Sequence, residues 1–199
     1  MTECGPLLAY APSSVSKPKT VGCIVDRMEV KIDSKDPMHV PGNILVKGEN
    51  VMLGYYKNQD ATKEVFPNKD GWMNTGDMGI IDKDGYITIS GRSKTMILGP
   101  SGQNIYPEEI EQKINNLPFV EESLVIEEKG KLIALLYLNE DAIKKQGIAA
   151  DEIDRIMKEN IDSLNKSLES FSKISSYRIV EKEFEKTPKK SIKRFLYQN

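Results

Sequence analysis

The sequence predicts an α+β protein, with a β-rich N-terminal part followed by a small α+β domain in which helices cover a sheet. Short runs of alternating apolar and polar residues, separated by glycine, proline and asparagine, fill residues 21–90. After Arg92, apolar residues recur at helical spacing, and these stretches alternate with further short apolar runs. We therefore expect two domains, residues 1–91 and residues 92–199.

The composition narrows the class of protein. The 199 residues include 28 lysines and arginines and 30 aspartates and glutamates, which gives a formal charge of −2. This balance argues against a dedicated nucleic-acid binder, because such proteins need a positive excess. The longest apolar runs are far shorter than the roughly 18 residues that span a bilayer, and no secretory signal is visible. With two cysteines and no CxxC pair, we expect a protein of the reducing cytoplasm.

The β-rich part contains five expected strands, at residues 21–25, 29–32, 43–47, 79–81 and 86–90. The last two flank Asp82-Lys83-Asp84-Gly85, which predicts a hairpin loop with Gly85 at a positive φ. A short helix is expected within residues 57–65, where Asp60 can cap free N–H groups. Asn74-Thr75-Gly76-Asp77, taken alone, is a β-turn signal.

Helices and strands alternate in the second part. Pro107 and the acidic residues after it suit the first turn of a helix, whose apolar face continues through Ile110 and Ile114. Strands are expected at 120–127 and 132–138, joined by a turn at 128–130. A long amphipathic helix over 151–171 and a strand at 177–180 complete this domain.

Three segments carry residues suited to chemistry. Asp77 and Arg92 lie at opposite ends of one expected hairpin, where a carboxylate can accept hydrogen bonds from ribose hydroxyls and a guanidinium can add donors in a fixed geometry. Residues 99–102 form a tight turn before a helix and lack the Gly-Lys-Ser/Thr ending of a P-loop. Residues 186–190 form a proline-interrupted basic loop, which is either a solvated face or a place to present an ammonium to an anionic substrate.

Taken together, these segments resemble the ordered motifs of the adenylate-forming (AMP-binding) enzymes, which include the acyl-CoA synthetases. The matching segments are Met1-Thr2-Glu3, Gly54-Tyr55-Tyr56, Asp70-Gly71-Trp72, Asn74-Thr75-Gly76-Asp77, Asp84-Gly85-Tyr86-Ile87, Gly91-Arg92-Ser93-Lys94 and the run from Gly102 to Glu111. That last run, with Ile192-Lys193-Arg194-Phe195, most resembles the long-chain fatty acid CoA ligase branch.

The resemblance implies a domain arrangement. Residues 1–91 would be the end of a large adenylation domain, with antiparallel strands of its barrel-like subdomain, and residues 92–199 would be the small mobile domain. The family's upstream loop for the ATP phosphates and its acyl pocket have no counterpart here. We therefore expect a C-terminal fragment that is inactive alone.

The resemblance also implies a reaction and its site. Family members use ATP and Mg²⁺ to convert a carboxylate, here a fatty acid, to an acyl-adenylate, and then transfer the acyl group to coenzyme A. Glu3 would bind Mg²⁺, Thr2 would contact the AMP phosphate, and Asp77 with Arg92 would bind the ribose. Lys94 would be the hinge, and the coenzyme A channel would be lined by Gly99, Ser101, Gly102 and Gln103.

One position departs from the family pattern, which near the C-terminus is Lys-Thr-x-x-x-Lys-Ile-x-Arg. Its second lysine reaches the reacting carboxylate and the α-phosphate. Alignment without gaps places Ser191 at that catalytic position and Lys190 one residue early. Because a neutral hydroxyl cannot replace an ammonium, either Lys190 reaches the site or adenylation is slower by on the order of 10² to 10³.

Other interpretations stay open at this point. The chain is alternatively a degenerate, non-catalytic module that binds nucleotides or another protein, or part of a ligase for an aryl or short-chain acid. The expected partners are a fatty acid, ATP and coenzyme A, with no nucleic acid and with membrane contact only through the parent protein. Strands between residues 21 and 90 would lose neighbours in a fragment, so we also expect self-association through open strand edges.

Overall fold

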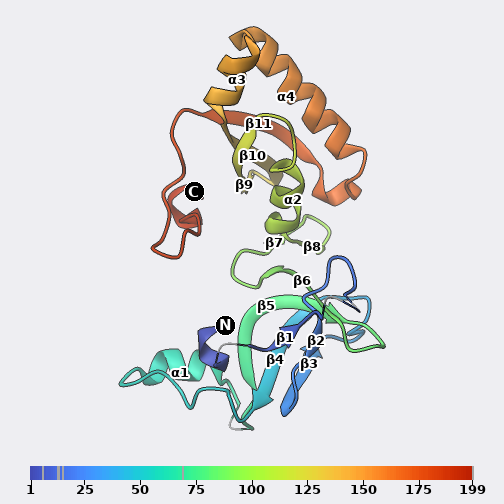
Figure 1. Ribbon diagram of the computed structural model, residues 1–199, viewed down its shortest axis with the longest axis vertical. Helices are drawn as coiled ribbons and strands as arrows, with labels where there is room; N and C mark the ends of the chain where they lie inside the picture. Colours follow the sequence, from blue (N-terminus) through green and yellow to red (C-terminus); the bar gives the residue numbers. More distant parts are fainter. Residues whose placement is uncertain (6, 13, 15, 69, 199) are drawn as a thin grey trace. The chain divides into compact units, whose positions relative to one another are not determined.

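A computed structural model describes residues 1–198 except 6, 13, 15 and 69. The chain divides into two compact units, Met1–Thr95 and Met96–Asn199 (Figure 1). The division falls beyond the boundary expected at residues 91 and 92, because the last strand of the first unit continues through Arg92. The expected α+β class is confirmed. Within the part of the chain that the structure describes, no helix is long and apolar enough to cross a membrane.

The first unit is built around a four-stranded antiparallel sheet of order β3-β4-β5-β6. Its elements are a 3-10 helix (Thr2–Cys4), β1 (Ala9–Tyr10), β2 (Cys23–Ile24), β3 (Met28–Asp33), β4 (Gly42–Gly48), α1 (Gln59–Val65), β5 (Met73–Ile81) and β6 (Ile87–Arg92). Strands β1 and β2 form a separate antiparallel pair. The core consists of Cys4, Met28, Ile32, Ile44, Val46, Met73 and Ile87.

Two local expectations for this unit are wrong. The cap of α1 is Asn58, whose Oδ1 accepts the Ala61 N–H at 3.1 Å, while Asp60 lies inside the first helical turn. Residues 74–77 are not an isolated turn but part of β5, which starts at Met73 and absorbs an irregularity around Gly76, at φ +75°. The loop at residues 82–85 is confirmed, with Gly85 at φ +82°.

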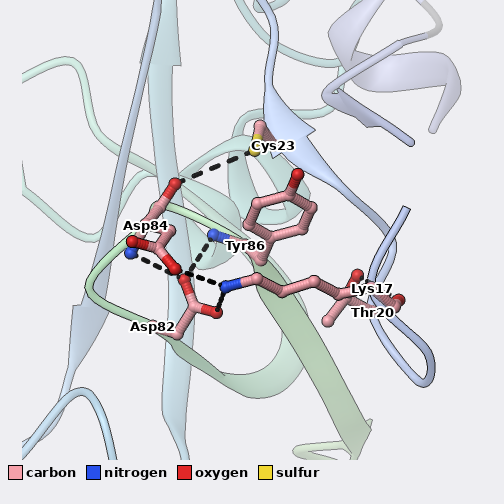
Figure 2. Close-up of polar contacts among 6 residues, drawn as sticks. All are labelled: Lys17, Thr20, Cys23, Asp82, Asp84 and Tyr86. Carbon is pink, nitrogen blue, oxygen red and sulfur yellow. Dashed lines mark hydrogen bonds and ion pairs between the residues drawn. The ribbon is translucent and has the colours of Figure 1, made fainter. Parts of the chain in front are cut away.

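An ion cluster fastens the chain near Lys17 to the β5–β6 loop (Figure 2). The Lys17 Nζ lies 2.7 Å from an Asp82 oxygen and 2.6 Å from an Asp84 oxygen, over the Tyr86 ring. The second oxygen of Asp82 accepts the backbone N–H groups of Asp84 and Tyr86, each at 2.9 Å. Hydrogen bonding to Lys17 therefore lowers the pKa of Asp82, and the two carboxylates raise the pKa of Lys17.

The second unit contains a three-stranded sheet of order β11-β10-β9. Its elements are β7 (Ile97–Leu98), β8 (Asn104–Ile105), α2 (Pro107–Ile114), β9 (Val120–Glu128), β10 (Lys131–Leu138), α3 (Glu140–Gln146), α4 (Ala150–Asn165), β11 (Ile174–Val180) and 3-10 helices at Ser170–Ser172 and Arg194–Leu196. Strand β10 is antiparallel to β9 and parallel to β11. Strands β7 and β8 form an antiparallel pair of their own.

Both faces of this sheet are covered, and alternate residues of a strand face opposite sides. Val125 and Leu136 belong to the cluster that includes α2 and α4. Leu124 and Leu135 belong to a second cluster with Phe184. We call residues 181–198 the C-terminal strap; it is the red segment that follows β11 in Figure 1. The strap closes the second face with Phe184 and Tyr197, whose rings lie 5.2 Å apart, edge to face.

The expected elements of this unit form, with shifted ends. Helix α4 ends at Asn165 instead of residue 171, because the Asn165 side chain bonds both the N–H and the carbonyl oxygen of Ile174, at 2.8 and 2.9 Å. Leu168 and Phe171 still pack against the same core from outside the helix. Helix α3 was not expected from the sequence, although Asn139 caps its start.

Candidate functional site

Asp77 and Arg92 lie opposite each other on the neighbouring strands β5 and β6. The Asp77 Oδ1 and the Arg92 Nε are 2.8 Å apart. The Asp77 side chain is 22% exposed, whereas that of Arg92 is 61% exposed. The structure thus brings together the two residues that the sequence analysis paired, as one sheltered carboxylate and one guanidinium that reaches into solvent.

The backbone around Asp77 is fixed by its own strand. The buried Thr75 hydroxyl donates to the Ile44 carbonyl at 2.9 Å and accepts the Asp77 N–H at 3.1 Å. The Gly76 carbonyl accepts the Ser93 N–H at 3.0 Å. These bonds tie β5 to the chain on either side, so the backbone that carries Asp77 is held in place.

Thr2 and Glu3 lie in the 3-10 helix that starts the first unit. The buried Cys4 anchors this turn, and the Glu3 carbonyl accepts the Met52 N–H at 2.8 Å. The Glu3 Oε1 accepts a hydrogen bond from the Tyr55 hydroxyl at 3.2 Å. Burial, and then the charge of Glu3, raise the pKa of Tyr55, which keeps this phenol protonated as a donor.

A single carboxylate is a sufficient protein contribution for Mg²⁺ when substrate phosphates supply further oxygens. Among the described residues, no three His, Cys, Asp or Glu side chains gather into a metal cluster. Glu3 is partly exposed and offers hard oxygen atoms, so its chemistry fits Mg²⁺ held jointly with a nucleotide.

Lys94 lies at the end of the first unit, just before the division between Thr95 and Met96. Its Nζ is 2.5 Å from a Glu64 oxygen on α1, and the Lys94 side chain is 80% exposed. An exposed ion pair of this kind contributes little to stability. The hinge role of Lys94 stays a prediction.

Residues 99–103 form the loop of the β7–β8 hairpin, so the turn belongs to a strand pair as well as preceding α2. The Gly99 N–H donates to the Gln103 carbonyl at 2.8 Å, and the Gly102 N–H donates to the Gly99 carbonyl at 2.9 Å. Gly102 has φ +83°, where glycine is favoured. Ser101 is exposed at the tip. Among the described residues, the buried Gln103 Oε1 finds no hydrogen-bond donor.

Residues 187–191 form a second loop with the same hydrogen-bond pattern. The Thr187 N–H donates to the Ser191 carbonyl and the Lys190 N–H donates to the Thr187 carbonyl, both at 2.8 Å. Lys190, at φ +61°, takes the left-handed position that Gly102 takes in the other loop. Lys190 and Ser191 are adjacent and exposed on this loop.

The residues that hold this second loop were not predicted from the sequence. Lys186 lies 2.6 Å from Glu122 and also pairs with Glu183. Arg194 pairs with Glu111, a buried residue of α2. Burial raises the pKa of Glu111, and the Arg194 charge opposes that shift. The only sign of this pair in the sequence is a carboxylate next to the apolar positions of a helix. The sequence does not indicate its partner, which lies 83 residues away.

Comparison with known proteins agrees with this architecture. The family model described as the AMP-binding enzyme C-terminal domain matches residues 94–198. A long-chain-fatty-acid–CoA ligase of Escherichia coli is 40% identical over 127 residues, which cover 61% of this chain and 22% of that protein. One from Yersinia pestis is 38% identical over 151 residues, covering 71% and 26%. The solved O-succinylbenzoate coenzyme A synthetase from Bacillus subtilis, in complex with ATP and magnesium ion, has a TM-score of 0.78 and 26% identity, covering 98% and 39%.

The fold and the matched region define a protein of the adenylate-forming class. This chain belongs to the AMP-binding enzyme family. It spans about a quarter of the length of the curated ligases it matches.

Proposed function

We propose that this chain is the C-terminal part of an AMP-forming acyl-CoA ligase whose substrates are a fatty acid, ATP and coenzyme A. The Asp77–Arg92 pair carries the proposal, because a sheltered carboxylate beside a guanidinium suits the two hydroxyls of a ribose. The long-chain-fatty-acid–CoA ligases among the relatives support the choice of acid. Cys4 and Cys23 are both free thiols, in keeping with the expected cytoplasm.

The reaction has two steps. The fatty acid carboxylate attacks the α-phosphate of ATP and releases pyrophosphate; the coenzyme A thiol then attacks the acyl-adenylate and releases AMP. Glu3 would hold Mg²⁺, which offsets phosphate charge when bound. The Thr2 hydroxyl would donate to the AMP phosphate, while Asp77 and Arg92 would hold the ribose.

In the second unit, Lys190 supplies the ammonium that the aligned Ser191 cannot. Lys190 adopts a backbone conformation that favours glycine, so the side chain is presented at some conformational cost. Lys186 and Lys193, which lie on either side of the loop, each form an ion pair with a glutamate. Among the described residues, the Lys190 ammonium has no such counter-ion, so it can serve a phosphate.

The loop at residues 99–103 would line the coenzyme A channel. Pantetheine carries amide N–H groups, and the unsatisfied Gln103 Oε1 is a suitable acceptor for one of them. A Cβ at Gly102 would meet no atom within 4 Å, so the loop leaves open space there for a narrow chain, with Ser101 beside it and the tightly packed Gly99 behind. Lys94 would be the point about which the second unit turns between the two steps.

A chimeric enzyme tests this proposal. Residues 1–199 would replace the matching C-terminal region of the Escherichia coli ligase, and pyrophosphate release and acyl-CoA formation would be measured with fatty, aryl and short-chain acids. We expect both activities with fatty acids and none from the isolated chain. A folded chimera that binds ATP but releases no pyrophosphate with any acid would overturn the proposal, and acyl-CoA formation by the isolated chain would refute its fragment status.

Ser191 favours a second candidate, a degenerate module that binds nucleotide without catalysis. The discriminating variant is Ser191→Lys in the same chimera. If the chain is a non-catalytic module, this variant should release no pyrophosphate. A large gain in pyrophosphate release would exclude that alternative. Preference for aryl or short-chain acids in the substrate panel would instead favour a different carboxylate-activating member.

A further inference from the structure

The outer strand β9 has one residue whose backbone is bonded to side chains on the free edge of the sheet. The Val125 N–H donates to the Glu111 Oε1 at 2.6 Å, and the Val125 carbonyl accepts from the Arg194 Nη1 at 3.3 Å. The Arg194 Nη2 donates to the Glu111 Oε2, which closes the ring of contacts. The carboxylate and the guanidinium together occupy the acceptor and donor positions that a neighbouring strand would supply.

This ion pair is buried. The Glu111 and Arg194 side chains are 11% and 14% exposed, and Glu108 adds a second carboxylate 3.7 Å from the guanidinium. Removing either partner of a buried pair leaves the other charge without compensation, so such a pair is hard to open. Arg194 is therefore a firm attachment of the C-terminal strap to α2 and β9.

The attachment lies next to the loop that presents Lys190. Arg194 follows that loop by three residues, and Lys186 precedes it with its own ion pair to Glu122. Lys186 and Ile192 also form a β-bridge across the base of the loop. Both ends of residues 187–191 are thereby tied to β9 or α2, while the loop itself is solvent-exposed.

We propose that Glu111 and Arg194 are positioning residues for the 187–191 loop: their ion pair at the edge of β9 fixes the C-terminal strap and so sets where Lys190 is presented. The catalytic meaning of this inference rests on the proposed function. Its structural half is measurable in the 199-residue chain itself.

The first experiment compares Arg194→Ala and Glu111→Gln with a matched control, Arg178→Ala. Arg178 pairs with Glu128 in the same sheet, but its side chain is half exposed. Cleavage after Lys189 or Lys190 by a lysine-specific protease and amide exchange would be measured under native conditions. We expect Arg194→Ala to speed cleavage and exchange at residues 185–193 about tenfold or more. Glu111→Gln keeps an acceptor for the Val125 N–H and should fall between this variant and the control.

Two results would contradict the proposal. Exchange that accelerates equally at Ala134 and Leu136 in β10 would mean that the pair only stabilises the whole unit, and unchanged cleavage would mean that it does not hold the loop. Either result would overturn the inference. A local effect confined to the strap supports it.

The second experiment places the same variants in the ligase chimera. We expect Arg194→Ala to lower kcat for pyrophosphate release about tenfold or more, with the KM for ATP little changed. Thioester formation from supplied acyl-adenylate should be unaffected. Equal losses in both steps would contradict a positioning role. An inactive unsubstituted chimera would count against the proposed function, and the cleavage and exchange data would still decide whether the pair holds the loop.

Discussion

The Asp77 carboxylate and the Arg92 guanidinium meet across β5 and β6, with Oδ1 and Nε 2.8 Å apart. The two residues are fifteen positions apart in the chain but direct partners in the sheet. Because the guanidinium is exposed, this ion pair adds little to the stability of the fold. Under the proposed function, the pair holds the ribose of the nucleotide.

Asp77→Ala should weaken AMP binding more than it weakens the fold. Loss of charge-assisted hydrogen bonds to the ribose predicts about a tenfold or larger rise in Kd. Calorimetric titration of AMP into the ligase chimera measures this effect, and thermal unfolding shows whether the first unit is intact. Asp33→Ala, at the exposed end of β3, is the matched control. An unchanged Kd in a folded Asp77 variant would show that this carboxylate does not bind the nucleotide.

Lys190→Gly separates the ammonium from the backbone that presents it. Glycine suits φ +61°, so the loop should be preserved and the free energy of unfolding should stay within about 1 kcal/mol of the original. Pyrophosphate release by the chimera should nonetheless fall by on the order of 10² to 10³, as it should for Lys190→Ala. Lys189→Ala is the control on the same loop. Equal loss in all three variants would indicate a general need for positive charge.

The fold was predictable where the pattern is local. The alternation of apolar and polar residues predicted β3, β4 and β6, and the spacing of Ile110 and Ile114 predicted α2. Errors arose where a distant partner decides the conformation. Helix α4 stops at Asn165 because that side chain forms hydrogen bonds with the backbone of Ile174. The spacing of apolar residues gives no sign of this contact.

The candidate site shows the same limit. The sequence predicts that Asp77 and Arg92 lie close together, because the hairpin loop between them brings its two ends side by side. Arg194 and Glu111 were not, since an ion pair spanning 83 residues depends on how the strap crosses the sheet. The sequence also did not reveal that Lys190 has a backbone conformation that favours glycine, because backbone hydrogen bonds to Thr187 define the 187–191 loop.

Lys17→Met should lower stability in a pH-dependent way. The pKa of Asp82 is lowered in the folded chain, so its contribution is present above about pH 4 and is lost as the pH falls through the folded pKa. The pKa of Lys17 is raised, so its contribution is present below about pH 10 and is lost as the pH rises further. The decrease in Tm, a few degrees at most for exposed charges, should therefore be constant near neutrality and vanish in acid.

Scanning calorimetry of Lys17→Met and of the unsubstituted chain across this pH range measures the difference. Lys83→Met, on the same loop, serves as the control for removing one positive charge. A Tm difference that persists unchanged at pH 2 would mean that Lys17 acts through packing on Tyr86 and not through the two carboxylates.

The isolated chain should self-associate through β3. This strand has one neighbour in its sheet, β4, whereas the outer side of β6 is partly covered by backbone bonds between Ile87 and residues 21 and 22. In the second unit, Glu111 and Arg194 already bond the β9 edge at Val125. Two antiparallel copies of β3 paired about Val30 would place Glu29 of each copy opposite Lys31 of the other, which is a favourable cross-strand pair.

Sedimentation velocity over a wide concentration range should show a reversible dimer. Glu29→Lys would place like charges opposite each other and should weaken the dimer, while the double variant Glu29→Lys with Lys31→Glu should restore it. Amide exchange at residues 28–33 should slow as the concentration rises. Monomers at every concentration, with unprotected β3 amides, would show that the charged residues along this edge keep it from pairing.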